Sequence, residues 1–477
     1  MHGAAYARRD VVKTPTPLHP RLSRRAAARW CAAALCVAAV VPFVACDRAR
    51  DDRAEVEFWT LSLSPMFDSF VRGRIEAFEA ENPGVRVRWI DVPYDALERK
   101  LIAAAAAGRA PDVVNMPDLN FARFVSLGAF RALDDCLPGG SDERYLPGAL
   151  ALCRVRGGLM ALPWYVNPQA RIVNTALLKK GGLDVDSVAR DWRGLAKQAK
   201  DFHAATGAYL FSQPLGEESQ LPIMLFAEGL SPLRPGAEGA LEPSLATPEI
   251  SAYLADFVRL YREGALPRDA ATRGHAHLTE MFQDGKVAVI STGPNFVKRI
   301  RDVSPTVYAS TQVLPGAVGA LNRVHLPVMV LAVTGQSRRP TEAAALAWFM
   351  TGPESQTEFC KHAAIMPSST GSLSDPFFAT PTARAGEDEK LLQARAVAAG
   401  TLADAAAFTA SVETWPDLRR AFEDEFKRVL LDGADLDESL RRIETHWGSI
   451  LRAAPPVGID ALPTREPVRA AGEAGRS

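Results

Sequence analysis

Pro163–Asn174, with the sequence PWYVNPQARIVN, has a composition that is unusual for a surface loop. Pro163 and Pro168 each disfavour helix in the residue before them, so we expect an extended segment. Two aromatic rings and several amides lie along it. Two interpretations fit this local pattern equally well. The segment is either an edge strand with a buried tryptophan, or a passage between two lobes that turns rings and amides toward a cleft.

The chain around this segment alternates between patterns typical of strands and of amphipathic helices. We expect strands at Glu55–Trp59, Val85–Ile90, Asp112–Met116, Val287–Ser291 and Pro327–Val333. We expect helices at Met66–Glu81, Leu97–Ala107, Phe121–Leu127, Trp192–Phe202, Ile250–Tyr261, Ala344–Met350, Leu418–Leu431 and Leu436–Trp447. This order predicts an α/β fold with mostly parallel sheets flanked by helices. About 400 residues exceed one ordinary core, so two lobes are expected.

The first 45 residues have the organisation of an export signal. An Arg-rich stretch precedes Trp30–Ala45, an apolar run of sixteen residues without a charge. A membrane span needs about 20 residues, whereas a signal-peptide core is shorter. The run ends at Phe43-Val44-Ala45-Cys46, which is similar to the lipobox of bacterial lipoproteins. That similarity implies lipidation of Cys46 and anchoring to the cell membrane, facing the periplasm or exterior. The alternative is an uncleaved membrane anchor.

Charge and cysteine content narrow the function classes. Residues 1–45 hold seven Arg or Lys and one Asp, so without them the formal net charge changes from −1 to −7. A mildly acidic body without a basic run does not indicate nucleic acid as a partner. Cys136, Cys153 and Cys360 remain in the mature chain without a CxxC motif, so neither a zinc site nor a thioredoxin-like site is indicated. A Cys136–Cys153 disulfide and buried free thiols both stay open.

The two ends of the mature chain are expected to lie outside the folded lobes. Residues 46–53 would form the lipid-anchored linker. Residues 453–477 are rich in Pro, Ala and charge without periodicity, which predicts a disordered tail.

Eight groups of short motifs in the mature chain carry a family resemblance. They are the strand Glu55–Trp59 with its following helix, Asn82–Val85, Gly108–Val114, Leu127–Asp134, Pro163–Tyr165 with Val173-Asn174, Gly181–Leu183 with Trp192, Phe282–Val289 with Gly293-Pro294, and Leu346–Thr351 with Pro353-Glu354 and Ile365–Pro367. In this order and spacing the chain resembles extracellular solute-binding proteins of the maltose-binding-protein type, which serve ABC importers.

The resemblance implies a two-lobe, hinge-closing fold of the type II periplasmic binding proteins. The chain would pass between the lobes near Pro163–Asn167, His325–Val333 and Met366–Ser372. The N-lobe would comprise 54–165 and 325–370, and the C-lobe 166–324 and 371–452. The expected partners are a small solute and membrane permease subunits with their ATPase. A monomer without cofactor, metal or enzymatic activity is expected.

The resemblance also implies positions for ligand contacts. They are Ser64, Met66, Met116, Asp118, Asn120, Trp164, Tyr165, Asn167, Glu218, Ser219, Asn295, Phe296 and Trp415. Trp415 matches a sugar-stacking aromatic of the family, whereas Asn167 replaces a carboxylate of the maltose binder. Aromatic faces suit sugar rings, and amides or carboxylates bind hydroxyls, so a carbohydrate is the expected solute. Arg171 would favour an anionic ligand if it faced the cleft; otherwise we expect a solvated ion pair.

Other chemistries fit the sequence less well. His275-Ala276-His277 is expected to be a surface loop rather than a metal site. Gly285-Lys286 lacks the spacing of a phosphate-binding loop. Glu217-Glu218 is too common a pair to indicate glycoside hydrolysis. An exported glycoside-processing enzyme and a protein that presents its ligand to a sensor are the alternative functions.

Overall fold

The structure is a computed structural model that describes residues 53–140, 142–237, 240–363, 365–379, 382, 388–402, 405–406 and 414–453. The predicted signal peptide, Cys46 and residues 454–477 of the predicted tail lie outside these ranges. Within them, no helix is both long enough and apolar enough to cross a membrane.

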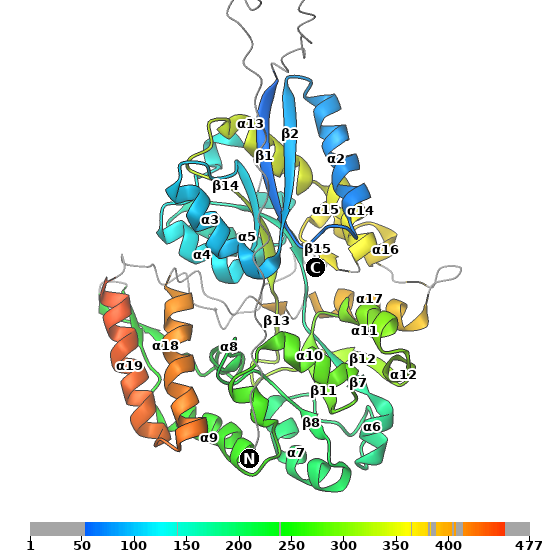
Figure 1. Ribbon diagram of the computed structural model, residues 1–477, viewed down its shortest axis with the longest axis vertical. Helices are drawn as coiled ribbons and strands as arrows, with labels where there is room; N and C mark the ends of the chain where they lie inside the picture. The colour runs from blue at the N-terminus through cyan, green and yellow to red at the C-terminus, as the bar shows by residue number, and fades with distance from the viewer. Residues whose placement is uncertain are drawn as a thin grey trace, which may run out of the picture. The chain divides into compact units, whose positions relative to one another are not determined.

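A six-stranded sheet forms the centre of the N-lobe (Figure 1). Its strands are β1 (Ala54–Leu61), β2 (Val85–Val92), β3 (Val113–Pro117), β6 (Leu162–Val166), β14 (Val328–Val333) and β15 (Met366–Pro367), in the order β15-β6-β14-β3-β1-β2. β1 is parallel to β2 and β3, whereas β14 runs antiparallel to β3 and β6. The sheet is therefore more mixed than expected, because β6 leaves the lobe and β14 returns to it in opposite directions.

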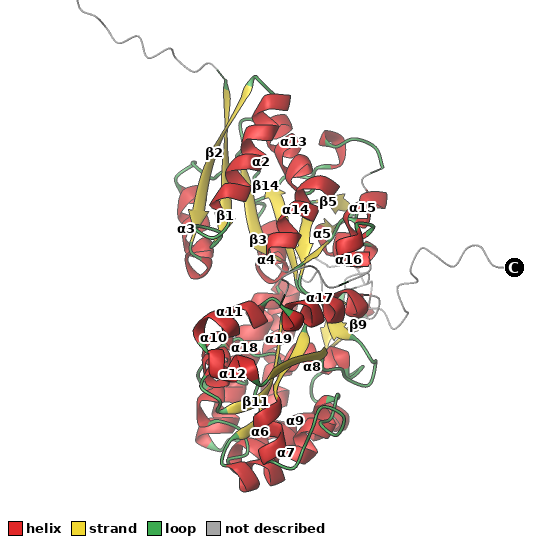
Figure 2. Ribbon diagram, turned by 90° about the vertical axis from the view of Figure 1, so that its right-hand side faces the viewer, coloured by secondary structure: helices red, strands yellow, loops and turns green. Residues whose placement is uncertain are grey.

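Helices surround this sheet. They are α2 (Asp68–Glu81), α3 (Leu97–Ala106), α4 (Asp118–Ser126), α5 (Pro147–Cys153), α13 (Pro340–Met350), α14 (Pro353–Ala363), α15 (Thr370–Leu373) and α16 (Pro376–Ala379), with the short 3-10 turns η1 (Tyr94–Ala96), η2 (Asp134–Cys136) and η3 (Asp142–Arg144) and a hairpin of β4 (Arg154–Val155) and β5 (Gly158–Leu159). α2, α13 and α14 pack against one another beside the sheet (Figure 2). Buried apolar side chains such as Phe70 of α2, Leu346 of α13 and Phe359 of α14 account for this packing.

A four-stranded sheet forms the centre of the C-lobe. Its strands are β7 (Ala170–Asn174), β8 (Tyr209–Phe211), β11 (Val287–Thr292) and β12 (Thr311–Pro315), in the order β12-β7-β11-β8. The lobe also contains α6 (Thr175–Lys180), α7 (Trp192–Thr206), α8 (Leu221–Ala227), β9 (Leu233–Pro235), β10 (Leu241–Pro243), α9 (Pro248–Arg262), η5 (Arg268–Ala271), α10 (His275–Gln283), α11 (Phe296–Val303), α12 (Pro305–Ala309), α17 (Glu389–Thr401), α18 (Trp415–Lys427), the π-turn η7 (Arg428–Asp432) and α19 (Leu436–Ala453). The caps expected from the sequence are present: Thr247 Oγ1 accepts from Ile250 N at the start of α9.

The segment Pro163–Asn174 passes from one sheet to the other, because it contains β6 of the N-lobe and β7 of the C-lobe. Its Trp164 is nevertheless buried in the N-lobe core, as the edge-strand interpretation expected. The chain returns through β13 (Val324–His325), which pairs with β16 (Ala405–Ala406), into β14. Neither β6 nor β7 lies at the edge of its sheet, so the edge-strand interpretation was right about the buried tryptophan and wrong about the edge.

The third passage lies later than expected. Leu373, Phe377 and Phe378 pack with the N-lobe core. α17 instead lies against β12, where Lys390 Nζ donates to the carbonyl of Thr311 at 2.6 Å. Residues 371–379 thus belong with the N-lobe, and the assignment of all of 371–452 to the C-lobe was wrong.

Candidate functional site

The N-lobe presents polar groups where β1 and β2 end. Asp91 organises this edge: its Oδ1 accepts from Leu63 N at 3.0 Å and its Oδ2 from Ser64 N at 3.1 Å. Ser62 Oγ in turn accepts from Tyr94 N at 3.0 Å. Parallel strands end at the same side of a sheet, which is where α/β proteins commonly bind ligands. The loops after β1 and β2 are therefore held together as one surface.

A hollow of about 450 Å³ opens on this surface. Its lining includes Ser62, Ser64 and Asp91, together with Arg72 and Trp89. The Arg72 guanidinium carbon lies 5.2 Å from the centre of the Trp89 ring, within the range of a cation–π contact. The sequence analysis missed Arg72, Trp89 and Asp91, although the position of Asp91 at the end of a predicted strand could have indicated it.

The phenol of Tyr94 lies near charged groups of both lobes. The pKa of its phenol is raised to about 12, first by desolvation and then by the carboxylates of Asp118 and Glu218, with Arg419 acting in the opposite direction. Asp118 begins α4 of the N-lobe, whereas Glu218 and Arg419 belong to the C-lobe. The Tyr94 side chain is itself 58% exposed. A neutral phenol hydroxyl is thus offered near acidic and basic groups of both lobes.

On the C-lobe side, Glu218 is held in place by neighbouring backbone. Its Oε2 accepts from His275 N at 2.8 Å, and His275 Nε2 lies 3.1 Å from Thr292 Oγ1. Glu218 has a φ of 51°, a conformation that non-glycine residues rarely adopt. Next to it, Ser219 N donates to Glu423 Oε1 at 2.8 Å. The carboxylate position therefore depends on tertiary contacts rather than on local preference.

Asn167, at the passage between the lobes, faces an amide of the C-lobe. Its Nδ2 donates to Asn295 Oδ1 at 3.1 Å. Its Oδ1 is buried and has no hydrogen-bond partner among the described residues. A Cβ at position 293 would overlap the Asn167 amide, so Gly293 is required for this approach. Asn167 therefore combines one satisfied donor with one unsatisfied acceptor.

The predicted ligand residues fall into three groups. The exposed group is Ser64, Met66 and Glu218. The half-buried group is Asn120, Tyr165, Asn167, Asn295 and Phe296. The buried group is Met116, Asp118, Trp164, Ser219 and Trp415. The interactions described above bring five of these residues to the candidate site, namely Ser64, Asp118, Asn167, Glu218 and Asn295. For the exposed and half-buried residues, ligand contact stays a prediction.

Four of the five buried residues offer almost no surface to a ligand in this structure, and one of them is Ser219, which is 0% exposed. Met116 and Trp164 belong to the N-lobe core. Trp415 is 2% exposed, and its ring packs against Phe226 and Trp447 in the C-lobe core. These side chains fill core positions that a sequence pattern does not distinguish from ligand positions, and we remove them from the candidate site.

Arg171 follows neither of the two expectations. Its side chain is buried, and it donates to the backbone carbonyls of Pro315 at 3.0 Å and Ala189 at 2.8 Å. Burial lowers the pKa of its guanidinium to about 10. The residue is thus neither a ligand cation nor a solvated ion pair, but ties β7 to β12 and to the segment before α7.

The structure also decides the expectations for the histidine pair and for the three cysteines. His275 and His277 begin a helix, α10, so the expected surface loop was wrong; His277 Nε2 lies 2.9 Å from Asp269 Oδ2. Cys136, Cys153 and Cys360 are free thiols, so the Cys136–Cys153 disulfide is not formed.

Comparisons with known proteins agree with this architecture. Residues 73–386 match the family described as bacterial extracellular solute-binding protein. A lipoprotein from the oleD 5′ region of Streptomyces antibioticus is 24% identical over 345 residues, covering 70% of this chain and 75% of the relative.

Solved structures share the fold. A protein from Synechococcus sp. MITs9220, described as a candidate oligosaccharide periplasmic-binding protein, has a TM-score of 0.76 at 29% identity over 83% of this chain and 99% of its own. The GacH receptor of Streptomyces glaucescens GLA.O, solved unliganded and with acarbose, has a TM-score of 0.68 at 22% identity over 84% of this chain and 100% of its own. The resemblance and the fold class are thereby confirmed, and this chain belongs to the bacterial extracellular solute-binding protein family, with the type II periplasmic-binding-protein fold.

Proposed function

We propose that this chain is the solute-binding lipoprotein of an ABC importer, that it captures a carbohydrate between its two lobes, and that it delivers the solute to membrane permease subunits. No chemistry is asked of the protein. The binding groups would be the exposed and half-buried residues of the candidate site, with Tyr94 and Arg72 added from the structure.

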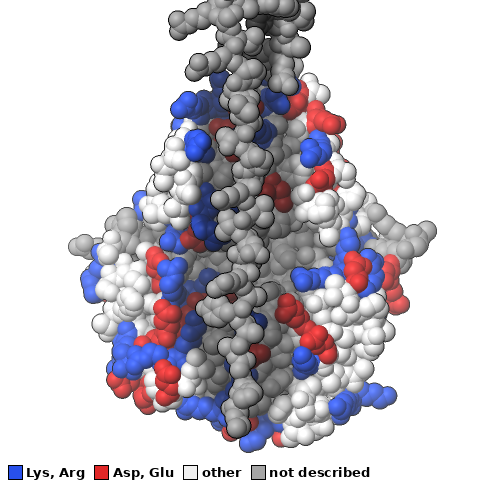
Figure 3. All heavy atoms as spheres, viewed as in Figure 1, with Lys and Arg blue, Asp and Glu red and all other residues white. Residues whose placement is uncertain are grey.

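The observation that carries this proposal is the amide of Asn167 at the passage between the lobes, whose Nδ2 donates to Asn295 and whose buried Oδ1 has no partner among the described residues. Its unsatisfied Oδ1 is an acceptor of the kind that a sugar hydroxyl would satisfy, and a buried unpaired acceptor costs about 1–3 kcal/mol. The neutral Tyr94 hydroxyl can donate and accept. Lys, Arg, Asp and Glu side chains are interspersed on the uncovered parts of the face shown in Figure 3.

Solute binding would close the hinge through contacts that differ between the open and the closed form. A solute held first by one lobe favours closure only if the other lobe adds contacts in the closed form. A shift from 1:99 to 99:1 needs about 5.5 kcal/mol of differential binding free energy. Asn167 and Asn295 lie on the C-lobe side of the passage, so a solute held there would contribute to this difference only by adding contacts to N-lobe groups such as Ser64 and Tyr94.

Titration calorimetry of the mature protein against a panel of mono- and oligosaccharides tests the proposal. We expect one sugar class to bind without turnover, and mass spectrometry of co-purifying molecules supplies the first candidates. Slow release of hydrolysed product from a bound glycoside would instead favour the glycoside-processing alternative.

Replacing Asn167 by alanine is expected to weaken binding of the tightest sugar about tenfold, or about 1.4 kcal/mol, because one acceptor and one donor are lost. Calorimetry measures the change. Gln169→Ala is the matched control: its amide accepts from Ser291 within the C-lobe at 3.0 Å, and its loss should leave affinity unchanged. Equal affinities for wild type and Asn167→Ala would remove Asn167 from the site.

Lipid anchoring is tested at Cys46. Cys46→Ala should abolish fatty-acid labelling and release the protein from the membrane fraction, or leave it unprocessed at higher mass. A variant that stays membrane-bound at the size of the mature wild type would show that lipid on Cys46 is not the anchor.

A further inference from the structure

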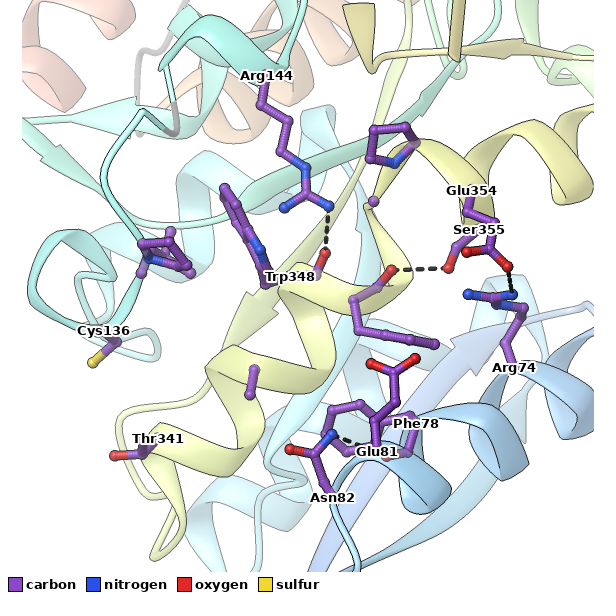
Figure 4. Close-up of a pocket in the computed structure, with 16 residues that line it drawn as sticks. Arg74, Phe78, Glu81, Asn82, Cys136, Arg144, Thr341, Trp348, Glu354 and Ser355 are labelled. Carbon is purple, nitrogen blue, oxygen red and sulfur yellow. Dashed lines mark hydrogen bonds and ion pairs between the residues drawn. The ribbon is translucent and has the colours of Figure 1, made fainter. Parts of the chain in front are cut away.

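A cavity of about 540 Å³ opens on the N-lobe and shares no lining residue with the candidate site (Figure 4). The end of α2, the segment between η2 and η3, α13 and the start of α14 surround it. Much of its wall is apolar or aromatic, formed by Phe78, Leu137, Pro138, Trp348 and Phe349. A volume of this size is in the range of small-molecule sites.

The cavity contains a cation without a counter-ion. The guanidinium carbon of Arg144 lies 3.6 Å from the centre of the Trp348 ring, and its Nη2 donates to the Trp348 carbonyl at 2.9 Å. Its Nε is buried and has no partner, and no acidic side chain of the described residues lies within ion-pair distance of it. Burial lowers the pKa of Arg144 from its ordinary value. A half-buried charge in this setting is stabilised when an anion joins it.

Arg74, on the opposite side of the cavity, shows the contrast. It also lies over an aromatic ring, 4.6 Å from the centre of Phe349. Its charge, however, is balanced by Glu354 at 2.8 Å and Glu358 at 3.7 Å. Of the two arginines that line the cavity, only Arg144 therefore has a charge left to pair.

The position of Arg144 is built into the fold. A Cβ at Gly352 would lie 2.5 Å from Arg144 Nη2, so a side chain there would displace the guanidinium. Tyr145, the next residue, is fixed by a hydrogen bond of 2.6 Å between its hydroxyl and that of Thr351. α14 begins at Pro353 on the cavity wall, so its dipole adds a favourable field for an anion.

We propose that this cavity is a second binding site, for a small monoanionic molecule that carries a carboxylate or similar acid on an apolar, preferably planar body. The acid pairs with Arg144, and the body lies against Trp348 and the neighbouring apolar wall. Glu81 and Glu354, which also line the cavity, disfavour ligands with several negative charges. The site is independent of solute capture between the lobes.

Calorimetry with naphthalene-2-carboxylate and its neutral analogue naphthalene-2-methanol tests the site. We expect the carboxylate to bind the mature wild type at least tenfold more tightly than the alcohol. Arg144→Gln should weaken carboxylate binding at least tenfold, and Arg144→Lys less, because a lysine keeps the charge but not the planar fork. Arg268→Gln is the matched control, since Arg268 lies over the Tyr261 ring of the C-lobe at 5.2 Å, and should bind as wild type.

Asn167→Ala should also leave carboxylate binding unchanged, which separates this site from the one between the lobes. Equal binding of carboxylate and alcohol, no binding by wild type, or wild-type binding by Arg144→Gln would overturn the proposal. If circular dichroism shows that Arg144→Gln does not fold, a crystal structure of the wild type with naphthalene-2-carboxylate replaces this test. We expect its carboxylate to lie at Arg144, and any other position would contradict the proposal.

Discussion

Replacing Trp164 by alanine is expected to lower the free energy of unfolding by about 3–5 kcal/mol, the range for removal of a large buried aromatic side chain. The Trp164 ring is fully buried and stacks on Phe359 with centroids 5.0 Å apart and an angle of 15°. It also lies 6.4 Å from the centre of the Phe58 ring of β1. Its loss leaves a cavity where β6 meets α14. Urea unfolding followed by circular dichroism measures the change.

Trp89→Ala is the control for this variant. Trp89 is half-buried, and its Nε1 donates to Thr60 Oγ1 at 2.7 Å at the edge of the sheet. Its loss should cost less stability. Similar losses for the two variants would contradict the assignment of Trp164 to the core, and so would a Trp164→Ala protein that keeps its stability but loses solute affinity.

Replacing Arg171 by methionine is expected to lower the free energy of unfolding by about 3 kcal/mol, because buried carbonyls lose charged donors. Methionine fills much of the same space but cannot donate to Pro315 and Ala189. Since β7 begins the C-lobe directly after the passage, the loss should also loosen the hinge side of its sheet. Thermal and urea unfolding measure the effect.

Arg190→Met serves as the matched control for Arg171→Met. Arg190 is half-buried, and its Nε makes a long hydrogen bond of 3.4 Å to the carbonyl of Gly316. Its replacement should change stability by less than about 1 kcal/mol. An Arg171→Met protein as stable as the wild type would show that the two carbonyls find other donors without cost.

The sequence predicted the elements well where periodicity was strong. The expected strand at 85–90 and helix at 97–107 correspond to β2 and α3, with ends shifted by one or two residues. The short stretch around His275 was expected to be a surface loop, but a helix forms there, because so few residues do not define a period. The sequence also predicted more parallel strand pairs than the two sheets contain. The direction of a strand depends on where the chain re-enters the sheet, and the residues of the strand do not show this.

The candidate site was predicted only in part. Asn167, Glu218 and Asn295 come together as polar groups of one region, whereas Trp415 and Met116 lie in the cores. Aromatic and sulfur-containing side chains have the same appearance in a sequence whether they contact a solute or fill a lobe. Tyr94 and Arg72 were missed because loops after two strands meet only once the sheet is formed.

By itself, the sequence determined the two-lobe α/β organisation, the family, and the role of Pro163–Asn174 as a segment that the prolines keep extended. Those features follow from local backbone preferences and from the order of motifs. The tertiary structure alone decided that Trp164 is a core residue, that Arg171 binds backbone carbonyls and that Arg144 has no acidic partner among the described residues. Burial and pairing depend on residues far apart in the chain, so no local pattern could reveal them.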